Sequence, residues 1–168
     1  MGKIFRRLLL PAAALALSLT QAASAHADTT NRNLQTPWDG GQCLRPDLYW
    51  PLGQSVHEYS CSDGLAHHWQ FAGPGGANTQ IWWAPNRGCL IPNWDRLGSP
   101  VVVSGDRSGN VCNRSDALWT FSWLHGDYYK IKNVATGLVL DYDDSGAGRG
   151  LQLWNDLGDS NQAFSLNP

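Results

Sequence analysis

The sequence predicts an all-β domain made of three similar units. Short runs of β-branched and aromatic residues, at 101–103, 128–131 and 138–142, alternate with turn-forming stretches. No window shows a sustained apolar period of 3.6 residues, so helix is expected only as single turns. The same pattern, which begins with Cys-Leu or Val-Leu and ends with an aromatic residue, occurs three times. Three such units in one small domain favour a closed barrel with approximate threefold symmetry, because closure leaves no exposed strand edge.

The spacing of these landmarks divides the chain. The units open at Cys43, Cys89 and Val139, which are 46 and 50 residues apart, and close at Trp69, Trp119 and Phe164, which are 50 and 45 apart. We therefore expect repeats at about residues 38–80, 81–125 and 126–168.

The first 27 residues have the three parts of a secretory signal peptide. Lys3, Arg6 and Arg7 precede an uncharged run at 8–20, and Ala-x-Ala endings follow at 23–25 and 25–27. A membrane anchor needs roughly 20 apolar residues, whereas this run is 13 long and contains Pro11. We expect residues 1–27 to be removed and residues 28–168 to form one domain. The protein is then secreted into the extracellular space and has no membrane span.

The charge argues against a nucleic-acid partner. The chain has 12 basic and 14 acidic residues, and loss of residues 1–27 leaves nine basic residues against 14 acidic ones. Binding to a phosphate backbone depends on clustered cations, but the basic residues are scattered singly. We expect no nucleic-acid partner, and we expect a monomer.

Four cysteines in an exported domain are most simply two disulfides. Sequence alone allows three pairings. The third repeat has Val139 and Asp156 where the first two repeats have cysteines, so both cysteines are lost together. This joint loss predicts the bridges Cys43–Cys61 and Cys89–Cys112, each inside its own repeat. No spacing typical of a zinc site occurs, and we expect no metal and no cofactor.

The third unit, "GLVLDYDDSGAGRGLQLWNDLGDSNQAF" at 137–164, resembles a repeat of the ricin-type β-trefoil lectins and the related carbohydrate-binding modules. Their mark is Q-x-W near the end of each repeat. The resemblance covers about residues 38–168 and is strong only in this unit. It implies a β-trefoil fold and a glycan or polysaccharide as the partner.

By this resemblance the third repeat holds one sugar site, made of Asp141, Gln152, Trp154, Asn161 and Gln162. Asp141 and Asn161 would hold sugar hydroxyls, because a carboxylate accepts two neighbouring hydroxyls and an amide both donates and accepts. Trp154 would stack on the apolar face of the sugar ring. Gln162 would brace the site from behind, and Gln152 would point toward the same ring edge.

The other two repeats depart from this pattern. The first has Arg45 for the Asp, Ala66 for the Asn, His67 for the Gln of Q-x-W, and Tyr59 as its aromatic. The second has Ile91 for the Asp, Asn110 for the aromatic, and Asp116 and Ala117 for the Asn-Gln pair. We expect neither repeat to bind sugar.

These expectations favour a lectin with one site for a galactose-like sugar or a xylan-type glycan. The alternative is a non-catalytic interaction protein on the same fold, such as a toxin-delivery subunit or an enzyme inhibitor, with a vestigial sugar site. We do not expect an enzyme. Glycoside hydrolysis needs two carboxylates on opposite sides of a bond, and Asp141, Asp143 and Asp144 lie close together on one loop.

Overall fold

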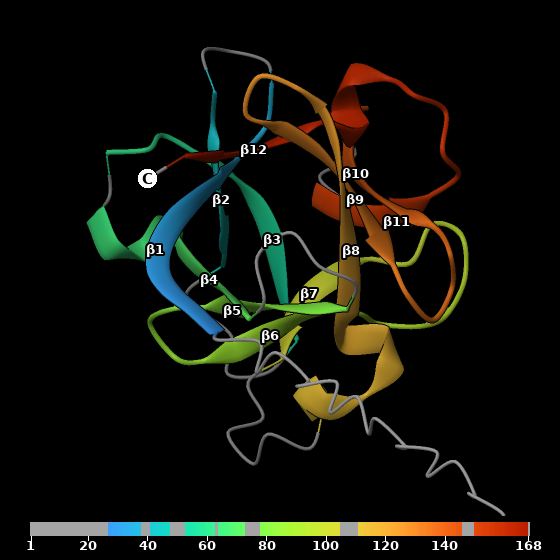
Figure 1. The fold of residues 1–168 in the computed structure, drawn as a ribbon, viewed down its shortest axis with the longest axis horizontal. Coiled ribbons are helices and arrows are strands. Elements are labelled where there is room, and N and C mark those ends of the chain that lie inside the picture. Colours follow the sequence, from blue (N-terminus) through green and yellow to red (C-terminus); the bar gives the residue numbers. More distant parts are fainter. Residues whose placement is uncertain are drawn as a thin grey trace, which may run out of the picture.

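A computed structural model describes residues 27–37, 41–47, 53–62, 64–72, 78–104, 111–145 and 150–167. Within these residues twelve strands form one continuous sheet, and helix occurs only as short turns (Figure 1). The strands are β1 (Ala27–Gln35), β2 (Cys43–Pro46), β3 (Gln54–Tyr59), β4 (His68–Ala72), β5 (Thr79–Trp83), β6 (Gly88–Pro92), β7 (Val101–Ser104), β8 (Leu118–His125), β9 (Tyr128–Asn133), β10 (Val139–Asp143), β11 (Gly150–Trp154) and β12 (Phe164–Asn167).

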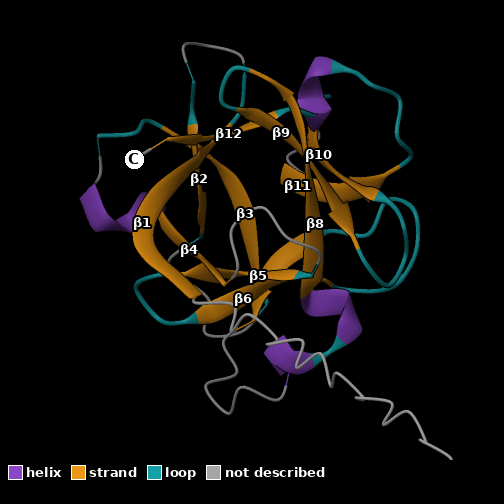
Figure 2. Ribbon diagram, in the orientation of Figure 1, coloured by secondary structure: helices purple, strands orange, loops and turns teal. Residues whose placement is uncertain are grey.

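The helical turns are η1 (Gly64–His67), η2 (Val111–Asn113), η3 (Ser115–Ala117) and η4 (Ser160–Gln162). Figure 2 shows them at the rim of the molecule, in three separate places around the strands. In each repeat one such turn directly precedes the last strand or is separated from it by one residue. No helix in the described part of the chain is long and apolar enough to cross a membrane.

Two strands from each repeat close a barrel. Antiparallel pairs run β1–β4, β4–β5, β5–β8, β8–β9, β9–β12 and β12–β1, so the ring returns to its first strand. The remaining strands form three hairpins, β2–β3, β6–β7 and β10–β11. Each repeat therefore contributes four strands in the same order, and the predicted β-trefoil fold is confirmed.

The core repeats with the same symmetry. Three triplets, each with one member per repeat, are fully buried: Leu34, Ile81 and Ile131; Leu44, Leu90 and Leu140; Trp69, Trp119 and Phe164. The indole of Trp69 donates to the carbonyl oxygen of Leu44 at 2.9 Å, and that of Trp119 donates to Leu90 at 3.0 Å. Buried indole N–H groups need such partners. Trp69 and Trp119 thus fasten the hairpins of the first two repeats to the barrel, and all three closing aromatics fill the core.

Both predicted disulfides are present. Cys43 is bonded to Cys61 and Cys89 to Cys112, with Cα–Cα distances of 5.0 and 5.7 Å. Each bridge closes the chain across the hairpin of its own repeat. By the loop-entropy model, each contributes on the order of 3 kcal/mol to stability.

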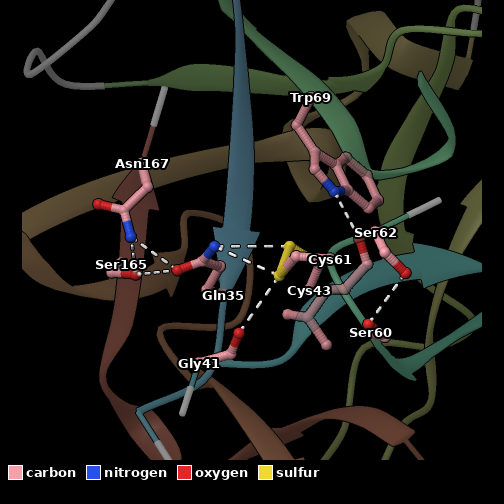
Figure 3. Close-up of a disulfide and its surroundings, with 10 residues drawn as sticks. Gln35, Gly41, Cys43, Ser60, Cys61, Ser62, Trp69, Ser165 and Asn167 are labelled. Atoms are coloured by element: carbon pink, nitrogen blue, oxygen red, sulfur yellow. Dashed lines mark hydrogen bonds between the residues drawn. A yellow bond between two sulfur atoms is a disulfide. The ribbon is translucent and has the colours of Figure 1, made fainter. Parts of the chain in front are cut away.

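Gln35, at the end of β1, connects the first bridge to the last strand (Figure 3). Its Nε2 lies 3.5 Å from the Sγ of Cys43 and 3.4 Å from that of Cys61. Its Oε1 accepts hydrogen bonds from Ser165 Oγ at 3.3 Å and from Asn167 Nδ2 at 2.6 Å. One side chain therefore joins the first and last strands at the barrel closure.

The first repeat begins earlier than the sequence predicts. β1 starts at Ala27, whereas the predicted boundary was about residue 38. The strand reads ADTTNRNLQ, and Leu34 is its only large apolar residue, so no apolar alternation indicates it. It forms because β4 and β12 offer backbone partners on both sides. The observed repeats span 27–72, 79–125 and 128–167.

Candidate functional site

The hairpin of the third repeat presents the predicted residues on one face. Asp141 on β10 is paired with Gln152 on β11, and Val139 is paired with Trp154. Directly opposed residues in an antiparallel pair project from the same face of the sheet. Asp141, Gln152 and Trp154 therefore share one face, while the pair Leu140 and Leu153 turns to the core on the other.

The carboxylate of Asp141 gathers three amide groups. Its Oδ1 accepts from Gln152 Nε2 at 2.9 Å, and its Oδ2 accepts from Asn161 Nδ2 and Gln162 Nε2, each at 3.0 Å. Asp141 is only 2% exposed. An ionised carboxylate only accepts hydrogen bonds, so these contacts fix which end of each amide faces it. The charge is buried but well compensated.

This arrangement leaves two amide carbonyls without a donor. The Oε1 of Gln152 and the Oδ1 of Asn161 are buried and have no hydrogen-bond partner among the described residues. A buried acceptor without a donor costs about 1–3 kcal/mol. A carboxylate offers roughly four acceptor positions, and the contacts to Asp141 occupy three of them. The site is thus rich in hydrogen-bond acceptors, and among its polar residues Asn161 is the one that is partly exposed.

Gln162, at the end of η4, holds the loop at 155–158, which leads into the turn that carries Asn161. Its Nε2 also donates to the carbonyl oxygen of Asn155 at 2.7 Å. Its Oε1 accepts from the backbone N–H groups of Leu157 and Gly158 at 2.9 and 3.2 Å. The side chain is 1% exposed, and both ends of its amide are engaged. Its amide thus links the Asp141 carboxylate to the backbone of residues 155–158.

Replacing Gln162 with Ala is expected to lower the free energy of unfolding by about 2 kcal/mol, because backbone groups of residues 155–158 lose their partners. Urea unfolding measures this change. Asn161 would also lose its fixed position, so sugar affinity should fall. A matched control is Gln70→Ala, whose amide makes an exposed contact with Asn31. Equal stability of the two variants would contradict the bracing role.

Trp154 is half-buried at the end of β11 and precedes an exposed segment at 155–160. Its position contrasts with that of Trp69 and Trp119, which are fully buried. The indole therefore keeps part of its surface for contact with a ligand.

The first repeat has the same hairpin geometry but a covered aromatic. Arg45 is paired with His57, and Cys43 with Tyr59, in the register of the third repeat. The place of Gln152 is therefore taken by His57, and the prediction of His67 for it was wrong, since His67 lies in η1. The guanidinium carbon of Arg45 lies 3.5 Å from the centroid of the Tyr59 ring. This cation–π contact places the protein's own side chain where a sugar would stack.

The hydroxyl group of Tyr59 also has a partner within the protein. Asp47 accepts a hydrogen bond from the Tyr59 hydroxyl at 2.6 Å, and His57 Nδ1 lies 3.1 Å from the same oxygen. Burial raises the pKa of Asp47, but the hydrogen bonds from Tyr59 and His57 and the nearby charges of His57 and Arg45 outweigh it. The pKa of Asp47 therefore lies below its ordinary value, and the carboxylate is ionised at neutral pH.

The second repeat has no aromatic at the stacking position. Cys89 is paired with Ser104, which therefore occupies the place of Trp154 and Tyr59. The prediction of Asn110 for this place was wrong. It came from counting back from Cys112, but residues 105–110 intervene between β7 and η2. Asn110 itself lies outside the described residues.

The residues of the second repeat that match Asn161 and Asp141 are engaged in contacts within the protein. Asp116 stands where the third repeat has Asn161, is 4% exposed, and forms an ion pair with Arg114. Ile91 stands where the third repeat has Asp141 and packs against the buried cluster around the second disulfide. In the described part of the chain, no group of three or more His, Cys, Asp or Glu side chains is placed to hold a metal ion.

Comparisons with known proteins agree with this geometry. Residues 115–168 match the family model of the ricin-type beta-trefoil lectin domain-like proteins, and this range contains all five predicted site residues. No curated protein matches the sequence.

Several solved structures share the fold. A designed threefold symmetric protein, ThreeFoil, is 19% identical, with a TM-score of 0.69 over 82% of this chain and 98% of its own. The ricin B-like lectin of Macrolepiota procera, solved in complex with lactose, is 19% identical, with a TM-score of 0.64 over 88% and 99%. An exo-beta-1,3-galactanase from Clostridium thermocellum is 20% identical, with a TM-score of 0.68 over 83% of this chain and 30% of that enzyme.

At these identities the solved structures show the fold alone, and the match to the family model is confined to the C-terminal part of the chain. The chain is therefore a β-trefoil protein whose residues 115–168 match the family model of the ricin-type beta-trefoil lectin domain-like proteins.

Proposed function

We propose that this protein is a carbohydrate-binding protein with a single sugar site in its third repeat. The observation that carries the proposal is the unmatched acceptor set beside an accessible indole. Two buried amide carbonyls, of Gln152 and Asn161, lack donors, and Asp141 keeps one acceptor position. Sugar hydroxyls supply such donors, and Trp154 supplies a flat apolar face for the ring.

The side-chain contacts in the first two repeats support a single site. In the first repeat, Arg45 covers Tyr59 and Asp47 takes its hydroxyl. In the second repeat, Ser104 replaces the aromatic and Asp116 is paired with Arg114. Neither repeat offers an aromatic face next to free acceptors, so we infer one site for each chain.

The ligand we propose is a galactose-like sugar or a xylan-type glycan. The Macrolepiota procera lectin of the same fold was solved with lactose, a galactoside. A non-catalytic role follows from the chemistry of the site. Glycoside hydrolysis needs two carboxylates on opposite sides of the bond, whereas Asp141, Asp143 and Asp144 lie close together on β10 and the turn that follows it.

A glycan array that includes galactosides and xylo-oligosaccharides tests this function. Binding to members of either group supports the proposal. Failure to bind any glycan would favour the alternative, an interaction protein whose sugar site is vestigial. A chromogenic-glycoside assay run alongside should give no turnover.

We also propose that residues 1–27 are a signal peptide and that the protein is secreted. The exported protein is expected to begin at His26 or Asp28, after one of the two Ala-x-Ala endings. Either cut leaves nearly all of β1, which starts at Ala27. Mass spectrometry of protein from the culture medium measures the new N-terminus. Recovery of intact Met1 in a membrane fraction would contradict the proposal.

A further inference from the structure

The loop between β6 and β7 is fixed by its own hydrogen bonds. Asn93 N donates to the carbonyl oxygen of Pro100 at 2.9 Å, and Trp94 N donates to Ser99 Oγ at 3.0 Å. Ser99 N donates to the carbonyl oxygen of Arg96 at 3.1 Å. Ser99 is completely buried. The loop therefore presents its side chains from a defined backbone.

This loop of the second repeat lies against the sugar-site strand of the third. Gly98 N donates to the carbonyl oxygen of Leu153 at 2.8 Å, and Leu153 N donates to that of Ser99 at 2.9 Å. A Cβ at Gly98 would lie 3.6 Å from Cζ3 of the Trp154 ring, and Gly98 has a φ of +73°. Glycine adopts this backbone conformation without strain. The loop thus forms one edge of the surface on which Trp154 lies.

The same loop carries a second accessible indole. Trp94 is 45% exposed, and Leu97 in the same loop is equally exposed. The guanidinium carbon of Arg96 lies 5.3 Å from the centroid of the Trp94 ring, farther than the 3.5 Å between Arg45 and Tyr59, and the Trp94 ring stays accessible. Neither the core nor a disulfide accounts for this indole, in contrast to the fully buried Trp69 and Trp119.

We propose that Trp94 is a second stacking platform, which contacts neighbouring units of a glycan chain whose principal unit lies on Trp154. The ligand is then an oligosaccharide or polysaccharide of neutral sugars rather than a terminal monosaccharide alone. The inference rests on the proposed sugar site in the third repeat. It adds that a loop of the second repeat, which has no site of its own, determines the preferred ligand length.

The direct test compares a monosaccharide with an oligosaccharide of the same sugar. Calorimetric titrations use galactose with β-galactan-derived oligosaccharides, and xylose with xylo-oligosaccharides. Trp94→Ala is expected to weaken binding of the oligosaccharide about tenfold, because one stacking surface is lost, and to leave monosaccharide binding unchanged. Trp154→Ala should lose both ligands. Trp123→Ala is the matched control, since this indole is 66% exposed on β8.

The outcomes separate the two proposals. Equal oligosaccharide affinity in Trp94→Ala and the unmodified protein would overturn the platform, and so would an equal loss in Trp123→Ala. A parallel loss of monosaccharide affinity in Trp94→Ala would also overturn it, since Trp94 would then act on the principal site. Full binding by Trp154→Ala would instead overturn the proposed site in the third repeat.

Discussion

Replacing Asp141 with Asn is expected to make sugar binding undetectable. The carboxylate accepts from Gln152, Asn161 and Gln162, and an Asn of the same shape turns an NH₂ group toward at least one of these donors. Hydrogen bonds to a charged acceptor contribute about 1.5–3 kcal/mol. A monosaccharide site with a Kd of about 1 mM has only roughly −4 kcal/mol in total, so little affinity would remain.

The same change is expected to lower the free energy of unfolding by about 1–3 kcal/mol, because a buried donor loses its acceptor. Calorimetric titration and urea unfolding measure the two effects. The control is Asp156→Asn in the same repeat, where an exposed carboxylate contacts Lys130 at 2.6 Å. That variant should keep both affinity and stability. Normal sugar affinity in Asp141→Asn would mean that this carboxylate is not at the binding site.

Trp154→Ala is expected to remove the stacking surface with little loss of stability, since the indole is half-buried and lies outside the core. Loss of one apolar contact face costs about 2 kcal/mol, or roughly thirtyfold in affinity. From a starting Kd of about 1 mM, binding would fall below calorimetric detection.

Tyr59→Ala and Ser104→Ala are the matched controls, because the strand register places them at the equivalent positions of the first two repeats. Both variants should bind sugar like the unmodified protein. If Tyr59→Ala abolished binding and Trp154→Ala did not, the functional site would lie in the first repeat.

The sequence predicts those parts of the fold in which a residue type recurs at a fixed spacing along the chain. The closing aromatics and the paired cysteines each occupy one structural position in a repeat, so their recurrence marks the repeats and the bridges. β1 leaves no such mark, because it is held by backbone pairing on both sides and has few apolar residues. The stacking position of the second repeat was also missed, since the extra residues at 105–110 break the spacing to Cys112.

Side-chain contacts across strands could not be predicted from the sequence. The replacement of an Asp by Arg45 indicates an inactive first repeat, but not that its guanidinium lies on Tyr59. The convergence of Asn161 and Gln162 on Asp141 depends on how η4 packs against β10. The exposure of Trp94 depends on a loop that bonds to another repeat, and no local pattern reports it.

The most direct test of the single site is an NMR titration of ¹⁵N-labelled protein with lactose and with xylobiose. The indole N–H of Trp154 and the side-chain amides of Gln152 and Asn161 are expected to shift with one saturable curve. Signals of the first repeat, including the backbone N–H groups of Arg45 and Tyr59, should stay in place. Shifts confined to the first repeat, with the Trp154 signal unchanged, would contradict a sugar site in the third repeat.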